Sequence, residues 1–169
     1  SSCGGGGSSG QLSALILPEG NRIDYQYDAI GNLVKIFDGE ENTIVYTYDA
    51  KGNRSKEEIR DAAGLLQKTL SYQYDLLNRP KQTINPDTSF TEFGYDKRGN
   101  RTTLKNPNGH TTTYAYDALR RVAKVTQPGS IATAYTYDRR SNLASVTDAG
   151  GHTTSYTYDK QNRLIKTVS

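Results

Sequence analysis

The chain has 169 residues, a length that suits one domain, and 34% of them are hydrophobic, below the roughly 45–50% usual for globular chains. Such a composition argues against a thick core. The net charge of +3 comes from 21 basic and 18 acidic residues that are well mixed along the sequence, so we expect no nucleic-acid partner. The apolar runs fall short of the roughly 18 residues that a membrane helix needs, so we also expect no membrane span.

Residues 1–10, SSCGGGGSSG, are typical of a flexible tether and contain the single cysteine. We interpret Cys3 as a candidate intermolecular crosslink. Lipid attachment is the alternative, but it requires Cys3 to be the first residue after processing, and Ser1 and Ser2 precede it. Because the chain contains no methionine, we expect that a signal peptide was cleaved from it or that it was excised from a longer protein.

From residue 11 to residue 169, one motif recurs seven times, as in YQYDAIGNL at 25–33 and YTYDAKGNR at 46–54. Successive motifs are 21, 26, 21, 21, 21 and 21 residues apart. A repeat period of about 21 residues predicts an array in which each unit packs against its neighbours. All 13 tyrosines lie in these motifs, and Phe93 takes the one remaining aromatic position. We assign a structural role to the pairs that define the repeat, which are Tyr27, Asp28, Tyr48, Asp49, Tyr74, Asp75, Tyr95, Asp96, Tyr116, Asp117, Tyr137, Asp138, Tyr158 and Asp159.

Each unit is predicted to be a turn, a strand, a second turn and a second strand, as in residues 138–159. Asp138 would open a type I turn, and its carboxylate would accept hydrogen bonds from backbone N–H groups of that turn. The fourth turn residue is expected to have a positive φ, as in a hairpin loop followed by a bulge. The seven residues at this position are Gly31, Gly52, Asn78, Gly99, Arg120, Ser141 and Asn162.

The two strands of a unit are rich in Thr, Val and Tyr, which suit a half-buried sheet surface. Tyr156 and Tyr158 are two residues apart and therefore share a face, which we expect to be covered, while the Thr and Ser face is wetter. Leu143 and Val146 are three apart, which breaks the alternation; a bulge beside the turn would restore it.

One hairpin, over residues 54–74, contains the five extra residues of the 26-residue step. Both of its strands are predicted to be longer and to project past the sheet edge, with Lys56, Glu57, Glu58 and Arg60 solvated. We favour a plain extension over a ligand-binding finger.

No residue set predicts catalysis, a cofactor or a metal site. His110 and His152 are two repeats apart, roughly 19 Å if each strand adds about 4.8 Å, which is too far for one metal ion. Asp117 and Asp138 would be roughly 9.6 Å apart, near the upper limit of about 9.5 Å for an inverting glycosidase pair. Such a pair needs one carboxyl of raised pKa, whereas these two occupy identical turn positions.

The recurring YxYDxxGN(R/L) and GHTTxYxYD sequences resemble the YD repeats of Rhs proteins, toxin-complex C components and teneurins. The resemblance covers nearly all of residues 11–169. It implies an all-β protein: an extended antiparallel sheet of about seven tandem β-hairpins, spiral or ribbon-like. In large members the sheet is a hollow, non-catalytic shell that encloses a toxin domain. Their effector and self-cleaving core have no match in this sequence.

The first functional hypothesis is a non-catalytic, secreted or cell-surface scaffold of bacterial type. Strand-like segments at 12–17 and 164–169 would leave open edges that pair with other copies of the chain and build a fibre. The alternatives are a fragment of a larger toxin-encapsulating shell, or a surface adhesin whose tyrosine and threonine surface binds carbohydrate. Copies of the chain, an encapsulated toxin domain and carbohydrate are therefore the expected partners.

Overall fold

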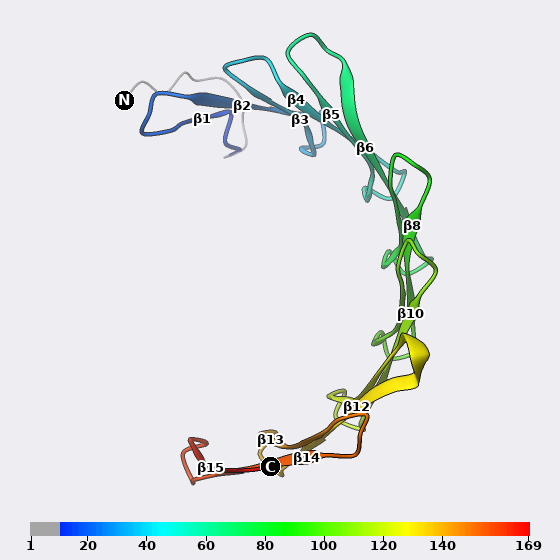
Figure 1. Cartoon of the computed structure of the whole chain (residues 1–169). Coiled ribbons are helices and arrows are strands. Elements are labelled where there is room, and N and C mark those ends of the chain that lie inside the picture. Colours follow the sequence, from blue (N-terminus) through cyan, green and yellow to red (C-terminus); the bar gives the residue numbers. More distant parts are fainter. Residues whose placement is uncertain (1–10) are drawn as a thin grey trace. The chain divides into compact units, whose positions relative to one another are not determined.

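The computed structural model describes residues 11–169, which form a single antiparallel sheet of 15 strands. Strands that follow one another in sequence are neighbours in the sheet, in the order β1 to β15 (Figure 1). The prediction of an all-β array of tandem hairpins is confirmed. The proposed tether and Cys3 lie outside the described residues.

The chain divides into two units, residues 1–88 and 89–169. The first contains β1 (Ala14–Ile16), β2 (Arg22–Tyr27), β3 (Leu33–Asp38), β4 (Thr43–Tyr48), β5 (Arg54–Arg60), β6 (Leu66–Tyr74) and β7 (Pro80–Ile84). The second contains β8 (Phe90–Tyr95), β9 (Arg101–Lys105), β10 (Thr111–Tyr116), β11 (Val122–Gln127), the short 3-10 turn η1 (Pro128–Ser130), β12 (Ile131–Tyr137), β13 (Leu143–Thr147), β14 (Thr153–Tyr158) and β15 (Leu164–Val168).

The seven Tyr-Asp motifs each end a strand and open the tight turn to the next one. In each turn the N–H of the fourth residue donates to the carbonyl of the aspartate, as from Ser141 to Asp138 at 3.1 Å. The fourth residue has a positive φ in all seven turns, which confirms the prediction. Arg120 and Ser141 adopt this conformation with φ of 63° and 67°, although glycine and asparagine tolerate it more cheaply.

A bulge follows each of these turns and places the side chains of the next strand. In the hairpin of β12 and β13, Tyr137 is opposite Leu143, the register then shifts by one residue, and Tyr135 is opposite Val146. Leu143 and Val146 therefore share the tyrosine face despite their spacing of three. The predicted bulge beside the turn is confirmed.

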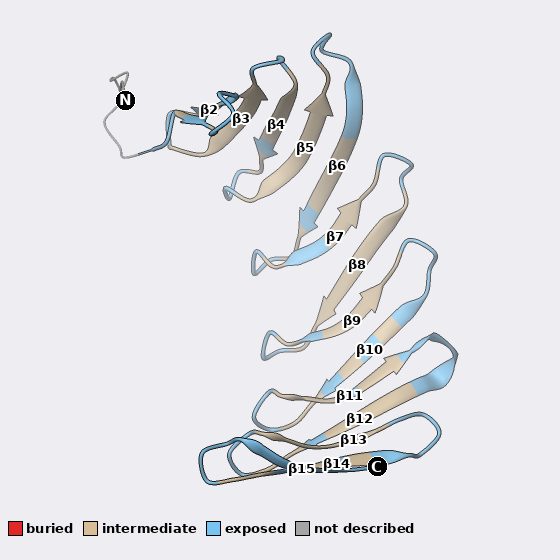
Figure 2. Ribbon diagram, turned by 60° about the vertical axis from the view of Figure 1, so that its left-hand side comes forward, coloured by how far each residue is buried: buried red, intermediate tan, exposed pale blue. Residues whose placement is uncertain are grey.

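The sheet has a drier and a wetter face but no core. In β14, Thr154, Tyr156 and Tyr158 are half-buried, whereas Thr153, Ser155 and Thr157 are exposed. None of the residues from 11 to 169 is fully buried, and Figure 2 shows half-buried strands between exposed turns. The low hydrophobic content is consistent with this one-layer arrangement.

The hairpin of β5 and β6 has strands of seven and nine residues, and its turn extends past the turn between β3 and β4 (Figure 1). The predicted lengthening and projection are confirmed. The expected solvation of its charged residues is wrong for Glu57 and Glu58, whose side chains are 18% and 17% exposed. Lys56 and Arg60 contact Glu58 from either side, at 2.6 and 3.3 Å, and shield it from solvent.

Two substitutions in the second unit test the cost of positive φ. A Cβ added at Gly99 meets no atom within 4 Å, so Gly99→Ala isolates backbone strain and should destabilise the protein by about 1 kcal/mol. Arg120→Gly should stabilise it by about 0.5 kcal/mol, because it removes strain of the same kind but adds freedom to the unfolded chain. Urea unfolding measures both, and effects of the same sign would contradict this account.

Candidate functional site

The aspartate of each Tyr-Asp motif accepts three hydrogen bonds within its own turn. Asp138 Oδ1 accepts from the backbone N–H groups of Arg140 and Asn142 at 2.8 and 2.9 Å, and Oδ2 accepts from the Asn142 side-chain amide at 2.9 Å. The same arrangement recurs at Asp28, Asp49, Asp75, Asp96, Asp117 and Asp159. Each carboxylate is therefore engaged locally.

The sequence analysis missed the partner that holds Oδ2, which is the fourth residue after the aspartate. This residue is asparagine or arginine in all seven turns, and both carry an N–H donor of suitable reach. They are Asn32, Asn53, Arg79, Asn100, Arg121, Asn142 and Arg163. The restriction to these two residue types at a fixed offset is the signal that could have revealed the contact.

These contacts lower the pKa of all seven turn aspartates. For Asp28, Asp49, Asp96 and Asp138, the hydrogen bond from the asparagine side chain is the main cause of the lowered pKa. For Asp75, Asp117 and Asp159, the main cause of the lowered pKa is the backbone N–H of the arginine at the same offset. Hydrogen bonds to the charged form favour ionisation, so the carboxylates stay ionised at neutral pH.

The second tyrosine of the motif connects one hairpin to the hairpin before it. The hydroxyl of Tyr137, in β12, donates to the Val122 carbonyl, in β11, at 2.9 Å. The equivalent bonds are Tyr27 to Leu12, Tyr48 to Leu33, Tyr74 to Arg54 and Tyr116 to Arg101, at 2.7 to 3.0 Å. The ring covers the sheet while the hydroxyl is satisfied by the backbone.

Neighbouring turns also contact one another through side chains. The Asn53 amide donates to Asn78 Oδ1 at 3.2 Å, and the Asn142 amide donates to Asn162 Oδ1 at 3.0 Å. Arg121 Nη1 donates to the Ser141 hydroxyl at 3.1 Å. The acceptor is in each case the positive-φ residue of the next turn. Ser141, a departure from the usual Gly or Asn, therefore provides an acceptor that glycine lacks.

An ion pair replaces aliphatic residues on the tyrosine face of the long hairpin. Glu57 lies opposite Tyr46, where Val146 lies opposite Tyr135 in a regular repeat. Arg54 contacts Glu57 at 3.3 Å and its guanidinium lies 4.0 Å from the centre of the Tyr46 ring. Burial is the main cause that raises the pKa of Tyr46. Glu57 is therefore largely covered, with its side chain 18% exposed, while the Arg54 side chain is 40% exposed.

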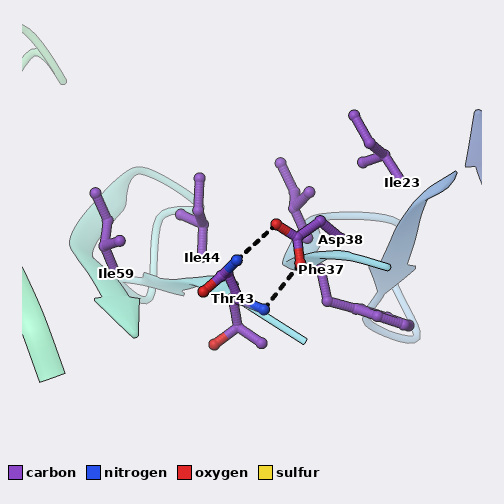
Figure 3. A pocket seen from close by; sticks show the side chains of 8 residues that line it. Ile23, Phe37, Asp38, Thr43, Ile44 and Ile59 are labelled. Atoms are coloured by element: carbon purple, nitrogen blue, oxygen red, sulfur yellow. Dashed lines mark hydrogen bonds between the residues drawn. The ribbon is translucent and has the colours of Figure 1, made fainter. Parts of the chain in front are cut away.

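An apolar hollow of the first unit lies on the same face. It has a volume of about 250 Å³ and is lined by Ile23, Ile36, Ile44 and Ile59, together with the turn that Asp38 opens. Figure 3 shows Ile23, Ile44 and Ile59 extending in the same direction from the sheet. The Asp38 carboxylate is bonded to Asn42 as the Tyr-Asp turns are bonded to their asparagines. No titratable group converges on this hollow except Asp38, whose pKa is lowered first by the Asn42 side chain.

The two histidines lie where turns end. His110 and His152 each close a turn through backbone bonds, to Asn106 and to Asp148 respectively. His152 Nδ1 also contacts the Asp148 carboxylate at 3.2 Å. Among residues 11–169, no three His, Cys, Asp or Glu side chains gather in a way that could hold a metal ion. The same residues contain no helix long and apolar enough to cross a membrane.

The sheet and its turns define a tandem β-hairpin repeat protein. The chain belongs to the RHS repeat family, whose model matches residues 27–66, 74–111, 95–132, 121–152 and 137–169, more than half of the sequence. The resemblance to YD repeats is thereby confirmed. Comparison with curated proteins gave no match.

Solved structures with a similar fold come from toxin complexes. The crystal structure of TcdB2-TccC3 is 19% identical over 86% of this chain, with a TM-score of 0.50. The Tc holotoxin pore of Photorhabdus luminescens is 20% identical over 85% of this chain, with a TM-score of 0.49. This chain spans 10% of the length of each of these chains. At this identity the likeness concerns the fold.

A hydroxyl deletion tests the bond between successive hairpins. Tyr137→Phe keeps the ring but removes the donor to Val122, and should lower the free energy of unfolding by about 1 kcal/mol. Tyr135→Phe is the matched control, because no described residue accepts a hydrogen bond from the Tyr135 hydroxyl; its effect should be less than half as large. Urea unfolding of the two variants measures the difference, and equal effects would contradict the assignment.

Proposed function

We propose that this chain is a non-catalytic wall segment of a larger Rhs-type container, built from repeats whose Tyr-Asp pairs hold the sheet together. The proposal rests on one observation, the hydrogen bonds that the seven motif aspartates accept. Each carboxylate accepts two backbone bonds and one side-chain bond inside its own turn. A group engaged in this way has little capacity left to bind or transform a substrate.

The family supports the container function. RHS repeats match most of the chain, and the similar folds occur in structures named for Tc toxin components. Because this chain spans 10% of those chains, it is proposed as part of a wall that a longer protein completes. A toxin domain enclosed by that wall is the proposed cargo, and a bacterial cell that secretes the assembly is the proposed source.

A fibre of copies paired end to end is the second candidate, and the edge strand β15 favours it. Its residues Leu164, Ile165 and Val168 are 54%, 63% and 48% exposed. Apolar edge strands promote pairing with other chains. A disulfide between two Cys3 thiols could crosslink such copies. Carbohydrate binding by the tyrosine face stays a prediction that glycan arrays of wild type and Tyr135→Ala would test.

The register of the terminal strands argues for the wall over the fibre. The Leu12 carbonyl before β1 accepts from Tyr27, just as the Val122 carbonyl of β11 accepts from Tyr137. Strand β1 therefore holds the place of a strand that follows a Tyr-Asp turn, and β15 is a strand of the same kind. Joining β15 of one copy to β1 of the next would place two such strands side by side, without the Tyr-x-Tyr-Asp strand that separates them elsewhere.

Electron microscopy of the purified chain and of the full-length gene product distinguishes the two candidates. The wall proposal predicts short single sheets for this chain and closed hollow particles for the full-length protein. Filaments formed by either sample would contradict it and support the fibre. A Cys3→Ser variant imaged in parallel excludes disulfide-linked pairs as the source of larger species.

A further inference from the structure

The two units carry opposite net charge. Residues 1–88 contain 9 basic and 12 acidic residues, a net charge of −3, whereas residues 89–169 contain 12 basic and 6 acidic residues, a net charge of +6. The charges that look well mixed along the whole sequence are therefore segregated by unit. Within the second unit the positive charge is concentrated further, because most of the basic residues lie in the turns and not in the strands.

Each of the four Tyr-Asp turns of the second unit carries two basic residues. Seven of these side chains are exposed and Arg121 is half-buried. We call this row the basic turn ridge; its members are Lys97, Arg98, Arg120, Arg121, Arg139, Arg140, Lys160 and Arg163. The opposite turns of the same unit, at 106–109, 128–130 and 148–151, contain no lysine or arginine.

The ridge is not a general property of the repeat. In the other unit, the first and third Tyr-Asp turns carry apolar residues at their tips, Ile30, Leu76 and Leu77, which are 84%, 91% and 71% exposed. The second turn carries a single basic residue, Lys51. The turn geometry is the same in both units, so it does not require basic residues at the tips. Formation of the turn therefore does not explain why basic residues occur at the tips of the second unit.

The turn aspartates neutralise only two members of the ridge: Asp117 pairs with Arg121 and Asp159 pairs with Arg163, each at 2.6 Å. Their carboxylates are half-buried and bonded to their own turns, while the basic tips extend into solvent. Among the described residues, Arg98, Arg139 and Lys160 have no acidic partner within 4.0 Å, and the same holds for Lys97 and Arg120. Arg140 is held in place by the carbonyls of Asp159 and Lys160, at 3.3 and 2.9 Å.

A hollow between the last two turns offers room for an anionic group. It has a volume of about 360 Å³ and is lined by Arg139, Arg140 and Lys160 on its basic side. The ring of Tyr158 and the aspartates Asp138 and Asp159 complete the lining. Arginine presents a planar fork that binds carboxylates in a bidentate manner, and five of the seven exposed ridge residues are arginine.

The spacing between successive turns of the ridge favours an extended polypeptide as the ligand. Successive turns are separated by two strands, roughly 9.6 Å at about 4.8 Å per strand. In a polyproline II chain every third side chain recurs on one face, at about 9.3 Å. A nucleic acid is disfavoured, because its single-stranded forms need exposed rings for base stacking, and the motif tyrosines are half-buried in the sheet.

We infer that the basic turn ridge is a docking surface for an extended acidic polypeptide segment with a carboxylate at every third residue. Each carboxylate would meet the basic side chains of one turn that are not paired with that turn's own aspartate, and the residues between would point away. This inference goes beyond the wall function and does not depend on it, since the surface is complete within the second unit.

Fluorescence anisotropy at about 0.15 M ionic strength, where the Debye length is about 8 Å, tests the inference with the whole chain and a labelled peptide of about fifteen residues that repeats Glu-Pro-Ala. The double variant Arg98→Glu/Arg139→Glu should weaken the affinity by about tenfold, as loss of electrostatic complementarity predicts. The matched control, Lys124→Glu/Lys166→Glu, changes the net charge equally on strands β11 and β15, and should weaken binding less than about twofold because of ionic screening. Thermal unfolding confirms that both variants fold; if the first does not, Arg98→Gln/Arg139→Gln replaces it.

Two further probes separate the alternatives. A peptide of the same composition with its glutamates in one block should bind more weakly than the repeating peptide. An oligonucleotide of equal charge should bind more weakly too. The inference is overturned by absent binding, by equal losses in the ridge and control variants, by equal affinity for the block peptide, or by tighter binding of the oligonucleotide.

Discussion

The closure of each Tyr-Asp turn by its own aspartate is the interaction on which the rest of the structure depends. Two backbone N–H groups and one side-chain donor converge on the carboxylate of Asp138, and the same contacts recur in six other turns. They fix where the turn begins and therefore where the following bulge falls. Because the side-chain period of a strand is two, a shift of one residue would move every tyrosine to the wet face.

A fixed register lets a sheet without a core remain ordered. None of the described residues is fully buried, so the hydrophobic contribution of each side chain is partial. The structure compensates by linking each hairpin to the next through backbone pairing, tyrosine hydroxyls and turn-to-turn bonds such as that from Arg121 to Ser141. Stability in such an array is the sum of unit and nearest-neighbour contributions, which suits a wall that grows by adding repeats.

Much of this fold could be predicted from the sequence because the same residue pattern recurs seven times. The spacing of the motifs gave the hairpins, the preference for Gly and Asn gave the positive φ, and Leu143 and Val146 gave the bulge. The bond from the Asn142 side chain to the Asp138 carboxylate was missed, as were its equivalents in the other turns. An asparagine or arginine at this position looks like an ordinary turn residue. Glu57 was misplaced, because local polarity does not show that it pairs with Arg54 and lies opposite Tyr46. The basic turn ridge required the fold, which brings turns 21 residues apart into one row.

The motif aspartates hold the sheet together, and the proposed recognition lies at the turn tips, where Leu77 in one unit and Arg140 in the other differ at equivalent positions. Titration of the aspartate carboxyl carbons by NMR tests this assignment most directly. The account predicts that all seven motif aspartates have a pKa below the ordinary value of an aspartate, since each carboxylate accepts the hydrogen bonds of its own turn. A motif aspartate whose pKa is raised toward neutrality would contradict it and would indicate an acid reserved for chemistry.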